Sequence, residues 1–419
     1  MKIFRHDKID KGTAKKYRFC GMTLLKSYQN PDAKRYYMLG LKVWSSKNIL
    51  NQEELIKQIT KSRENILWID HRLGGGADQY SQSQFNDLQK KVNILRLQYC
   101  PLNKYFILQQ PFAPKQCILT EISEVYNLLE QISWDKIVIN NLVGYTNPIE
   151  ILSWIEKIKI KNDKILISFR CHDYYAVCPR FNLLDCDGKF CNLNYSKGCD
   201  ECLKFLYSPN EDNRLVPKQD LNIKSWRNNW QHFFENVCDE VIAFSASTAN
   251  IFSSVFSVKD IIKVIPHKSA DLPMVQIPKH KQINIVFLGN LSNYSKGRDV
   301  LIEMSKYVKN YKDVKLHVIG KMTKGYKNIK VMGKYKVTEL PKIIQQIKTD
   351  IVFISSICPE TFSYTTAEAM SMGLPVVCYN LGAPAERIQN YKKGLVLNEI
   401  NPEENLKEII NFVTDLKNK

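Results

Sequence analysis

The chain has 419 residues, 44% of them hydrophobic and 24% charged, a composition that is typical of a globular protein. Its length exceeds that of one ordinary hydrophobic core and favours two domains. No apolar run approaches the ~18 residues that a membrane-spanning helix needs, and the first residues lack the apolar stretch of a signal peptide. Twelve cysteines without a secretory signal suggest reduced thiols rather than a disulfide framework. We therefore expect a cytoplasmic protein.

The net charge of +18 is concentrated at the N-terminus. Residues 1–50 hold twelve Lys and Arg against three Asp, which gives them a net charge of +9. Such an excess favours anionic partners: phosphorylated substrates, nucleic acid, or the anionic inner face of a membrane on which the protein would be peripheral. The alternative is an ordinary basic surface without a ligand. No helix-turn-helix, zinc-finger or RNA-binding signature accompanies the charge, so nucleic acid is not expected.

Residues 1–60 are expected to form a basic N-terminal extension with a weak internal repeat. The stretch Lys16-Tyr-Arg-Phe-Cys-Gly-Met is similar to Arg35-Tyr-Tyr-Met-Leu-Gly-Leu, nineteen residues later. Each copy has an aromatic and basic start, a glycine and then apolar residues, which predicts short hairpin-like strands. These strands would either rest on a membrane face or form a sheet appended to the main domain.

Residues 61–270 alternate between strand and helix patterns, which predicts a doubly wound α/β domain. Two amphipathic stretches, 118–132 and 148–160, are predicted to be helices. The short runs rich in β-branched residues are predicted strands, at 66–69, 92–97, 136–139, 165–169 and 240–244.

Two motifs that could contact a ligand follow strands of this domain. Gly74, Gly75 and Gly76 come after the first strand, where residues without Cβ let the backbone approach a ligand closely. His172 and Asp173 come directly after strand 165–169, and an imidazole there can bond a sugar hydroxyl or a leaving phosphate. The alternatives are a tight turn without a ligand and a structural histidine.

Four cysteines lie in an expected insertion at about 175–215. Their thiolates would suit a tetrahedral structural zinc, although their intervals are not those of a standard zinc finger. The alternative is a set of buried thiols with a chance C-x-x-C. The four residues are Cys178, Cys191, Cys199 and Cys202.

Prolines at 266, 273 and 278 mark a linker near 267–281. A second α/β domain, 280–419, follows, with strands predicted at 283–289, 314–320, 329–332 and 351–354, and a helix from Pro402. After its first strand, Gly289 allows close approach of the backbone, and Lys296 is placed to pair with a diphosphate. The alternative is an ordinary turn with a surface lysine.

The most informative segment is 359–377, Pro-Glu-Thr-Phe-Ser-Tyr-Thr-Thr-Ala-Glu-Ala-Met-Ser-Met-Gly-Leu-Pro-Val-Val. Glu360 is predicted to lie in a loop after a buried strand, because Pro359 disfavours a helix before it. A helix capped by Ser363 or the threonines after it would run to about Met372, and its free N–H groups suit a phosphate. Glu368, inside that helix, can accept hydrogen bonds from both hydroxyls of a ribose. The alternative is a capped helix with two solvated glutamates.

The E-x7-E spacing followed by Ala-Met-Ser-Met-Gly-Leu-Pro-Val-Val resembles the donor-site signature of retaining glycosyltransferases of family 4. The resemblance implies the GT-B fold, in which two Rossmann-like domains face a central cleft. It implies that Glu360 faces the transferred sugar and Glu368 holds the ribose. The loop around Lys296 resembles the family's G-R-L…K-G motif, but Asn290 stands at the usual arginine position. Arg298 or Lys321 would have to supply the missing charge.

By the same resemblance, the Gly-Gly loop faces the donor phosphates and the acceptor, His172 lines the cleft, and the chemistry needs no metal. Glu360, His172 and Lys296 are the expected catalytic residues. The expected donor-binding residues are Gly289, Asn290, Lys296, Arg298, Thr361, Phe362, Ser363 and Glu368.

The function implied is transfer of a sugar from a UDP- or GDP-sugar to a glycan or lipid-linked acceptor. Bacterial synthesis of lipopolysaccharide, capsule or exopolysaccharide is the expected setting, by analogy of fold. The first competing hypothesis is a non-catalytic nucleotide- or sugar-binding protein with the same fold, and Asn290 is its main support. The second, less favoured, is a nucleic-acid-binding protein, which only the positive charge suggests.

Overall fold

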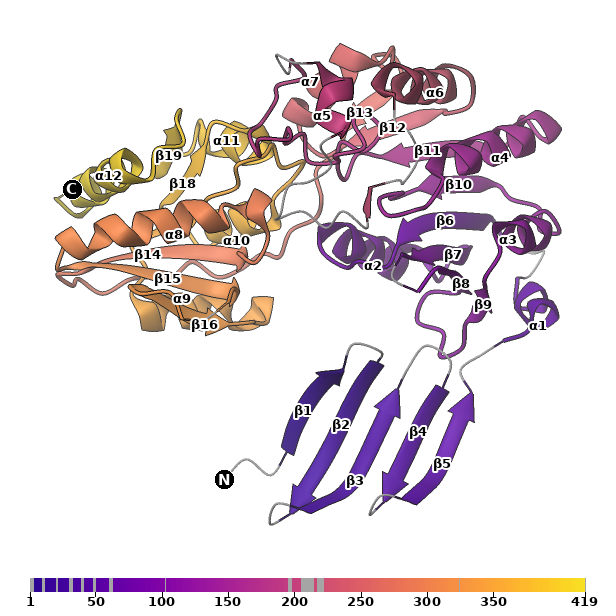
Figure 1. Ribbon diagram of the computed structural model, residues 1–419, viewed down its shortest axis with the longest axis horizontal. Helices are drawn as coiled ribbons and strands as arrows, with labels where there is room; N and C mark the ends of the chain where they lie inside the picture. The colour runs from indigo at the N-terminus through magenta and orange to yellow at the C-terminus, as the bar shows by residue number, and fades with distance from the viewer. Residues whose placement is uncertain are drawn as a thin grey trace.

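The structure is a computed structural model that holds three sheets (Figure 1). For residues 4–9, 12–19, 22–29, 33–38 and 41–47 it describes the backbone alone. It describes residues 50–59, 63–101, 103–194, 198–204, 215–216, 222–323 and 325–418 in full. No helix in these ranges is long and apolar enough to cross a bilayer.

The N-terminal residues form an antiparallel sheet of five strands in chain order, where the repeat had predicted short hairpin-like strands. The two copies of the repeat correspond to the β2–β3 and β4–β5 hairpins, and the register of both hairpins shifts at the equivalent tyrosines, Tyr17 and Tyr36. The turns at 20–21 and 39–40 lie outside the described residues. The strands are β1 (Phe4–Ile9), β2 (Gly12–Phe19), β3 (Met22–Gln29), β4 (Ala33–Met38) and β5 (Leu41–Lys47).

The central domain is built on an eight-stranded sheet of order β13-β12-β11-β10-β6-β7-β8-β9, parallel except at the β7–β8 and β8–β9 pairs. Its middle strands are buried along their whole length, as expected of a parallel sheet covered on both faces. The strands are β6 (Asn65–His71), β7 (Asn93–Cys100), β8 (Tyr105–Gln109), β9 (Cys117–Leu119), β10 (Lys136–Ile139), β11 (Leu166–Arg170), β12 (Glu240–Ala243) and β13 (Ile262–Val264).

The helix predicted over 118–132 is partly wrong. Residues 117–119 are the edge strand β9, and the helix begins only after Glu121, which forms a capping box with Glu124. The helix predicted at 148–160 is confirmed. The helices are α1 (Gln52–Lys57), α2 (Gly76–Leu88), α3 (Ile122–Leu129), α4 (Pro148–Lys161), α5 (Cys199–Lys204), α6 (Ile223–Asn236) and α7 (Ala246–Val255).

The C-terminal domain has a six-stranded parallel sheet of order β16-β15-β14-β17-β18-β19. Its strands are β14 (Ile283–Asn290), β15 (Val314–Lys321), β16 (Ile329–Gly333), β17 (Ile351–Ile354), β18 (Val376–Tyr379) and β19 (Gly394–Leu397). Its helices are α8 (Arg298–Tyr307), α9 (Leu340–Ile347), α10 (Tyr364–Ser371), α11 (Gly382–Ile388) and α12 (Pro402–Asn418), with the 3-10 turns η2 (Tyr294–Lys296), η3 (Val308–Asn310) and η4 (Val337–Glu339).

The two α/β domains meet through an aromatic cluster. Phe362 and Tyr364, at the start of α10, pack with Tyr80 and Phe244 of the central domain. The ring of His267, on the segment that joins the domains, stacks on Phe362 at 4.4 Å between centroids.

Two Rossmann-like domains that face each other in this way form the GT-B fold. The loop after β17 meets the loop after β11 through Thr361 and His172, and the start of α10 lies against Gly76 after β6.

Candidate functional site

Glu360 lies in the loop between β17 and α10, where its carboxylate pairs with Lys296 at 2.9 Å. Ser356 Oγ donates a second hydrogen bond to it. Burial opposes ionisation of Glu360, but the charge of Lys296 and these hydrogen bonds outweigh it, so the pKa lies below its ordinary value. Glu360 is thus ionised at neutral pH and held in one place.

Lys296 ends the 3-10 turn η2, and its position depends on the glycine after it. Gly297 has φ of +77°, and a Cβ there would lie 1.9 Å from the carbonyl oxygen of Ser355. Ser355 Oγ donates to the carbonyl of Lys296 at 2.9 Å. The Lys-Gly step is therefore locked against the loop after β17. The lysine side chain keeps 38% of its surface accessible, so it can also reach a ligand.

Glu368 is the second glutamate, one turn inside α10 and only 3% exposed. Burial raises its pKa to about 7. Among the described residues its side chain is bonded by Tyr335, in the loop after β16, whose hydroxyl donates to Oε2 at 3.1 Å. Sequence reasoning missed Tyr335, because nothing in the local pattern shows that a loop 33 residues away reaches α10. The structure thus keeps a buried acceptor that is only partly satisfied, as a hydroxyl-binding carboxylate requires.

The start of α10 differs slightly from the prediction. The helix begins at Tyr364, and Ser363 precedes it at φ of +66° without bonding the helix N–H groups. Instead, Ser363 Oγ accepts a hydrogen bond from the hydroxyl of Thr366 at 2.9 Å. The side chain of Ser363 therefore leaves the first N–H groups of α10 without a cap.

Gly74, Gly75 and Gly76 form the turn between β6 and α2. Gly74 and Gly75 have positive φ, and a Cβ on either would meet no atom within 4 Å, so the turn borders open space. A Cβ on Gly76 would lie 3.4 Å from the ring of Tyr364, which places the turn opposite the start of α10. Next to Gly74 is a cavity of about 440 Å³ that Arg72, Gln82 and Gln98 also line.

His172 and Asp173 follow β11. His172 contacts the other domain, whereas Asp173 bonds neighbouring loops of its own domain. The carbonyl of His172 accepts a hydrogen bond from Thr361 Oγ1 at 2.9 Å, which ties the residue to the Glu360 loop. Asp173 accepts from Asn141 Nδ2 at 2.7 Å and from the N–H of Tyr175 at 2.8 Å. Burial raises the pKa of Asp173 to about 6. Its carboxylate shapes the turn that presents His172.

The remaining predicted donor-side residues surround the end of β14. Gly289 faces Thr365, and Asn290 Oδ1 accepts from the N–H of Ser292 at 3.2 Å. Lys321 lies beside Asn290 in the sheet register. Arg298 Nε donates to its neighbour Asp299 at 2.6 Å.

Phe362 lies among aromatic and cationic side chains rather than beside the glutamates. The guanidinium of Arg387 lies 3.8 Å from the centroid of its ring, and the imidazole of His267 stacks on it. In this structure Phe362 therefore packs the domains together.

The four predicted zinc ligands do not form a metal site. In the described part of the chain, no three His, Cys, Asp or Glu side chains are placed to hold a metal ion. Burial raises the pKa of Cys178 and of Cys202 to about 12, and it also raises that of Cys191. Without a metal ion these three cysteines are therefore neutral thiols, buried in whole or in part. The structure does not support the zinc prediction.

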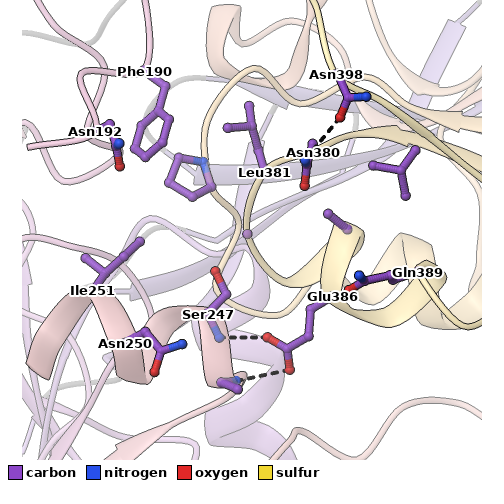
Figure 2. Close-up of a pocket in the computed structure, with 15 residues that line it drawn as sticks. Phe190, Asn192, Ser247, Asn250, Ile251, Asn380, Leu381, Glu386, Gln389 and Asn398 are labelled. Atoms are coloured by element: carbon purple, nitrogen blue, oxygen red, sulfur yellow. Dashed lines mark hydrogen bonds between the residues drawn. The ribbon is translucent and has the colours of Figure 1, made fainter. Parts of the chain in front are cut away.

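A second cavity, of about 710 Å³, lies between the domains beside α7 and α11 (Figure 2). Figure 2 shows Glu386 reaching across to the first turn of α7, where its carboxylate accepts the N–H groups of Ala246 at 3.1 Å and Ser247 at 2.7 Å. A carboxylate at a helix N-terminus is favoured by the exposed N–H groups and the helix dipole. Glu386 thus fastens the two domains together.

Replacing Glu386 by alanine should lower the free energy of unfolding by about 1 kcal/mol, because two N–H groups of α7 lose their acceptor. Urea titration followed by circular dichroism measures this change. Glu408→Ala, which removes an exposed glutamate of α12, is the matched control and should be neutral. Equal stability of the two variants would contradict a role for the Glu386 contact.

The sequence of the C-terminal domain is similar to that of known glycosyl transferases. Residues 282–415 match a sequence model described as "Glycosyl transferases group 1". A stretch of 64 residues is 38% identical to sucrose synthase of Melioribacter roseus; it covers 15% of this chain and only 8% of that relative.

Among solved structures, Anabaena Alr3699/HepE in complex with UDP-glucose matches with a TM-score of 0.52 at 15% identity, over 84% of this chain and 90% of that one. Sucrose-phosphate synthase of Thermosynechococcus elongatus matches with a TM-score of 0.54 at 12% identity, over the same shares. The lipopolysaccharide outer core galactosyltransferase WaaB matches with a TM-score of 0.51 at 13% identity, again over 84% and 90%. At these identities the likeness establishes the fold.

Proposed function

We propose that the protein is a retaining glycosyltransferase that moves a sugar from a nucleotide-diphosphate sugar to a glycan or lipid-linked acceptor. The observation that carries the proposal is the pairing of Lys296 with Glu360 at 2.9 Å, just before the helix α10 that holds Glu368. The first residue of that helix, Tyr364, lies against Gly76 of the glycine turn. The match of residues 282–415 to glycosyl transferases group 1 supports the proposal. The complex of HepE with UDP-glucose supports a UDP-sugar as the first donor to test.

In the proposed reaction, Glu368 binds the ribose hydroxyls and Glu360 orients the sugar. The bond between the anomeric carbon and the diphosphate oxygen breaks, and the acceptor oxygen bonds that carbon from the same face. The acceptor proton passes to the departing diphosphate. Lys296, the N–H groups at the start of α10 and Arg298 stabilise its charge, and this chemistry calls for no catalytic metal.

The acceptor is proposed to enter beside Gly74, where the cavity of about 440 Å³ borders the turn. A surface-polysaccharide intermediate fits this proposal, and the basic residues 1–50 would favour an anionic carrier or membrane face. Binding to vesicles that contain anionic lipid, compared with neutral vesicles, tests the membrane part: equal binding would contradict it.

Incubation with a panel of UDP- and GDP-sugars, followed by detection of free nucleotide, tests the proposed function. Slow release of UDP or GDP without acceptor is expected. The competing hypothesis, a non-catalytic nucleotide-sugar-binding protein, rests on Asn290 in place of the family's arginine. It predicts that a donor raises the melting temperature but stays intact, with and without every acceptor tried.

A further inference from the structure

A chain of hydrogen bonds runs from the core of the central domain to His172. Ser81 Oγ lies 2.8 Å from Asp70 Oδ2 and accepts the indole N–H of Trp68 at 3.0 Å. Asn140 Nδ2 lies 3.1 Å from Ser81 Oγ. Asn140 Oδ1 lies 2.9 Å from Nε2 of His172. Asp70, Ser81 and Asn140 have no exposed surface, so water cannot replace any of these partners.

The direction of each hydrogen bond follows from the groups involved. An indole N–H can only donate, and the carboxylate of Asp70, paired with Arg96 at 2.6 Å, can only accept. The hydroxyl proton of Ser81 therefore goes to Asp70. Its two lone pairs remain for Trp68 and for the amide group of Asn140.

This arrangement fixes the orientation of the Asn140 amide, because only its Nδ2 can donate to Ser81. Its oxygen must then face His172, and an amide oxygen only accepts, so Nε2 of His172 carries a proton. Burial lowers the pKa of His172 well below its ordinary value, so the ring is neutral. The second ring nitrogen, Nδ1, is left with a free lone pair.

Nδ1 of His172 is available to a ligand. No described residue donates a hydrogen bond to it, and His172 as a whole is half-buried rather than fully enclosed. The carbonyl of the same residue takes the hydrogen bond from Thr361, next to Glu360. The lone pair therefore lies at the junction of the two domains.

We propose that Asn140 is a positioning residue that holds His172 as the neutral Nε2–H tautomer, so that Nδ1 accepts a hydrogen bond from a hydroxyl of the bound sugar. The sugar in this statement rests on the proposed function, whereas the tautomer does not. A lone pair repels phosphate oxygens, so His172 serves a sugar hydroxyl and not the leaving diphosphate. Sequence reasoning had left these two roles open.

The tautomer is measured by long-range ¹H–¹⁵N spectra of the full-length protein labelled at its seven histidines. His172→Gln identifies the signals. The wild-type protein should show His172 with a protonated Nε2 and an unprotonated Nδ1. Asn140→Ala and Ser81→Ala should each give a mixture of tautomers, since the amide constraint is lost. A proton on Nδ1, or an imidazolium, in the wild-type protein would overturn the proposal and leave the proposed function standing.

Kinetics separate positioning from a merely structural role. Asn140→Ala should reduce donor turnover about tenfold in the wild-type background, through the loss of one oriented hydrogen bond. In a His172→Ala background, Asn140→Ala should reduce donor turnover less than about twofold, because Asn140 acts through His172. Fully additive losses would overturn the proposal. Should Asn140→Ala fail to fold, the same cycle is run with Ser81→Ala.

The role of the lone pair is tested with donors in which single hydroxyls are replaced by fluorine, which cannot donate a proton. Fluorine also slows cleavage by withdrawing electrons, in both proteins alike. At one position the loss of turnover should therefore be about tenfold larger with the wild-type protein than with His172→Ala. Losses of equal size in both proteins at every position would contradict a hydroxyl at Nδ1.

Discussion

Replacing Lys296 by methionine should reduce nucleotide release from a nucleotide-sugar donor by about 100-fold or more. The change keeps the length of the side chain and removes its charge, which is proposed to stabilise the leaving diphosphate. It also leaves Glu360 without the cation that lies 2.9 Å away, so that a largely buried carboxylate loses its partner. Both effects lower turnover in the same direction.

The matched control for this variant is Lys306→Met. Lys306 pairs with Glu303 on the exposed face of α8, so its loss should change neither turnover nor stability by more than the small value of a surface ion pair. Single-turnover assays with saturating donor make the comparison. Turnover of Lys296→Met within about twofold of the control would contradict the site assignment.

Replacing Glu368 by glutamine should change stability and activity in opposite directions. In the unfolded chain this carboxyl ionises near its ordinary pKa of 4.5, and in the folded protein burial raises the pKa to about 7. Between these values the unfolded state binds fewer protons, so stability falls as the pH rises. The variant removes this penalty, and at pH 8 its free energy of unfolding should exceed that of the wild type by on the order of 3 kcal/mol.

Donor use by the same variant should fall about tenfold, because the ribose loses charge-assisted hydrogen bonds. For the wild type, the KM for the donor should rise as the pH falls below about 7, since the protonated carboxyl accepts fewer hydrogen bonds. The variant should lack this dependence. Denaturant titration and donor KM at pH 6 and pH 8 measure both effects. A wild type with pH-independent stability and KM would contradict a buried, ribose-binding Glu368.

Much of the sheet structure was predictable from sequence because parallel strands are buried on both faces. The strands predicted at 136–139 and 351–354 match the observed bounds, and others differ by a few residues at their ends. The antiparallel edge was not predicted. The apolar residues 117–119 fit a helical period as well as a strand, and only their pairing with β8 decides between the two.

The local parts of the site were also predictable. Pro359, the glutamate spacing and Gly373 together indicate a loop, a helix and a turn in that order, and the structure has them. The residues that hold the glutamates and the histidine were not predictable. Tyr335 and Asn140 reach Glu368 and His172 across 33 and 32 positions of the sequence, and such contacts exist only once the strands are ordered in the sheet.

A nucleotide-sugar is proposed to bind between the Gly74–Gly76 turn and the Glu360–Glu368 segment and to be cleaved there. The most direct test is to measure, in one experiment, donor binding by calorimetry and free nucleotide by chromatography for the wild type and Lys296→Met, across the UDP- and GDP-sugar panel. We predict that at least one donor binds the wild type and is cleaved to free nucleotide. In Lys296→Met the rate of nucleotide release should be about 100-fold lower. Binding of no donor, or release that is unchanged in Lys296→Met, would contradict this site and its activity.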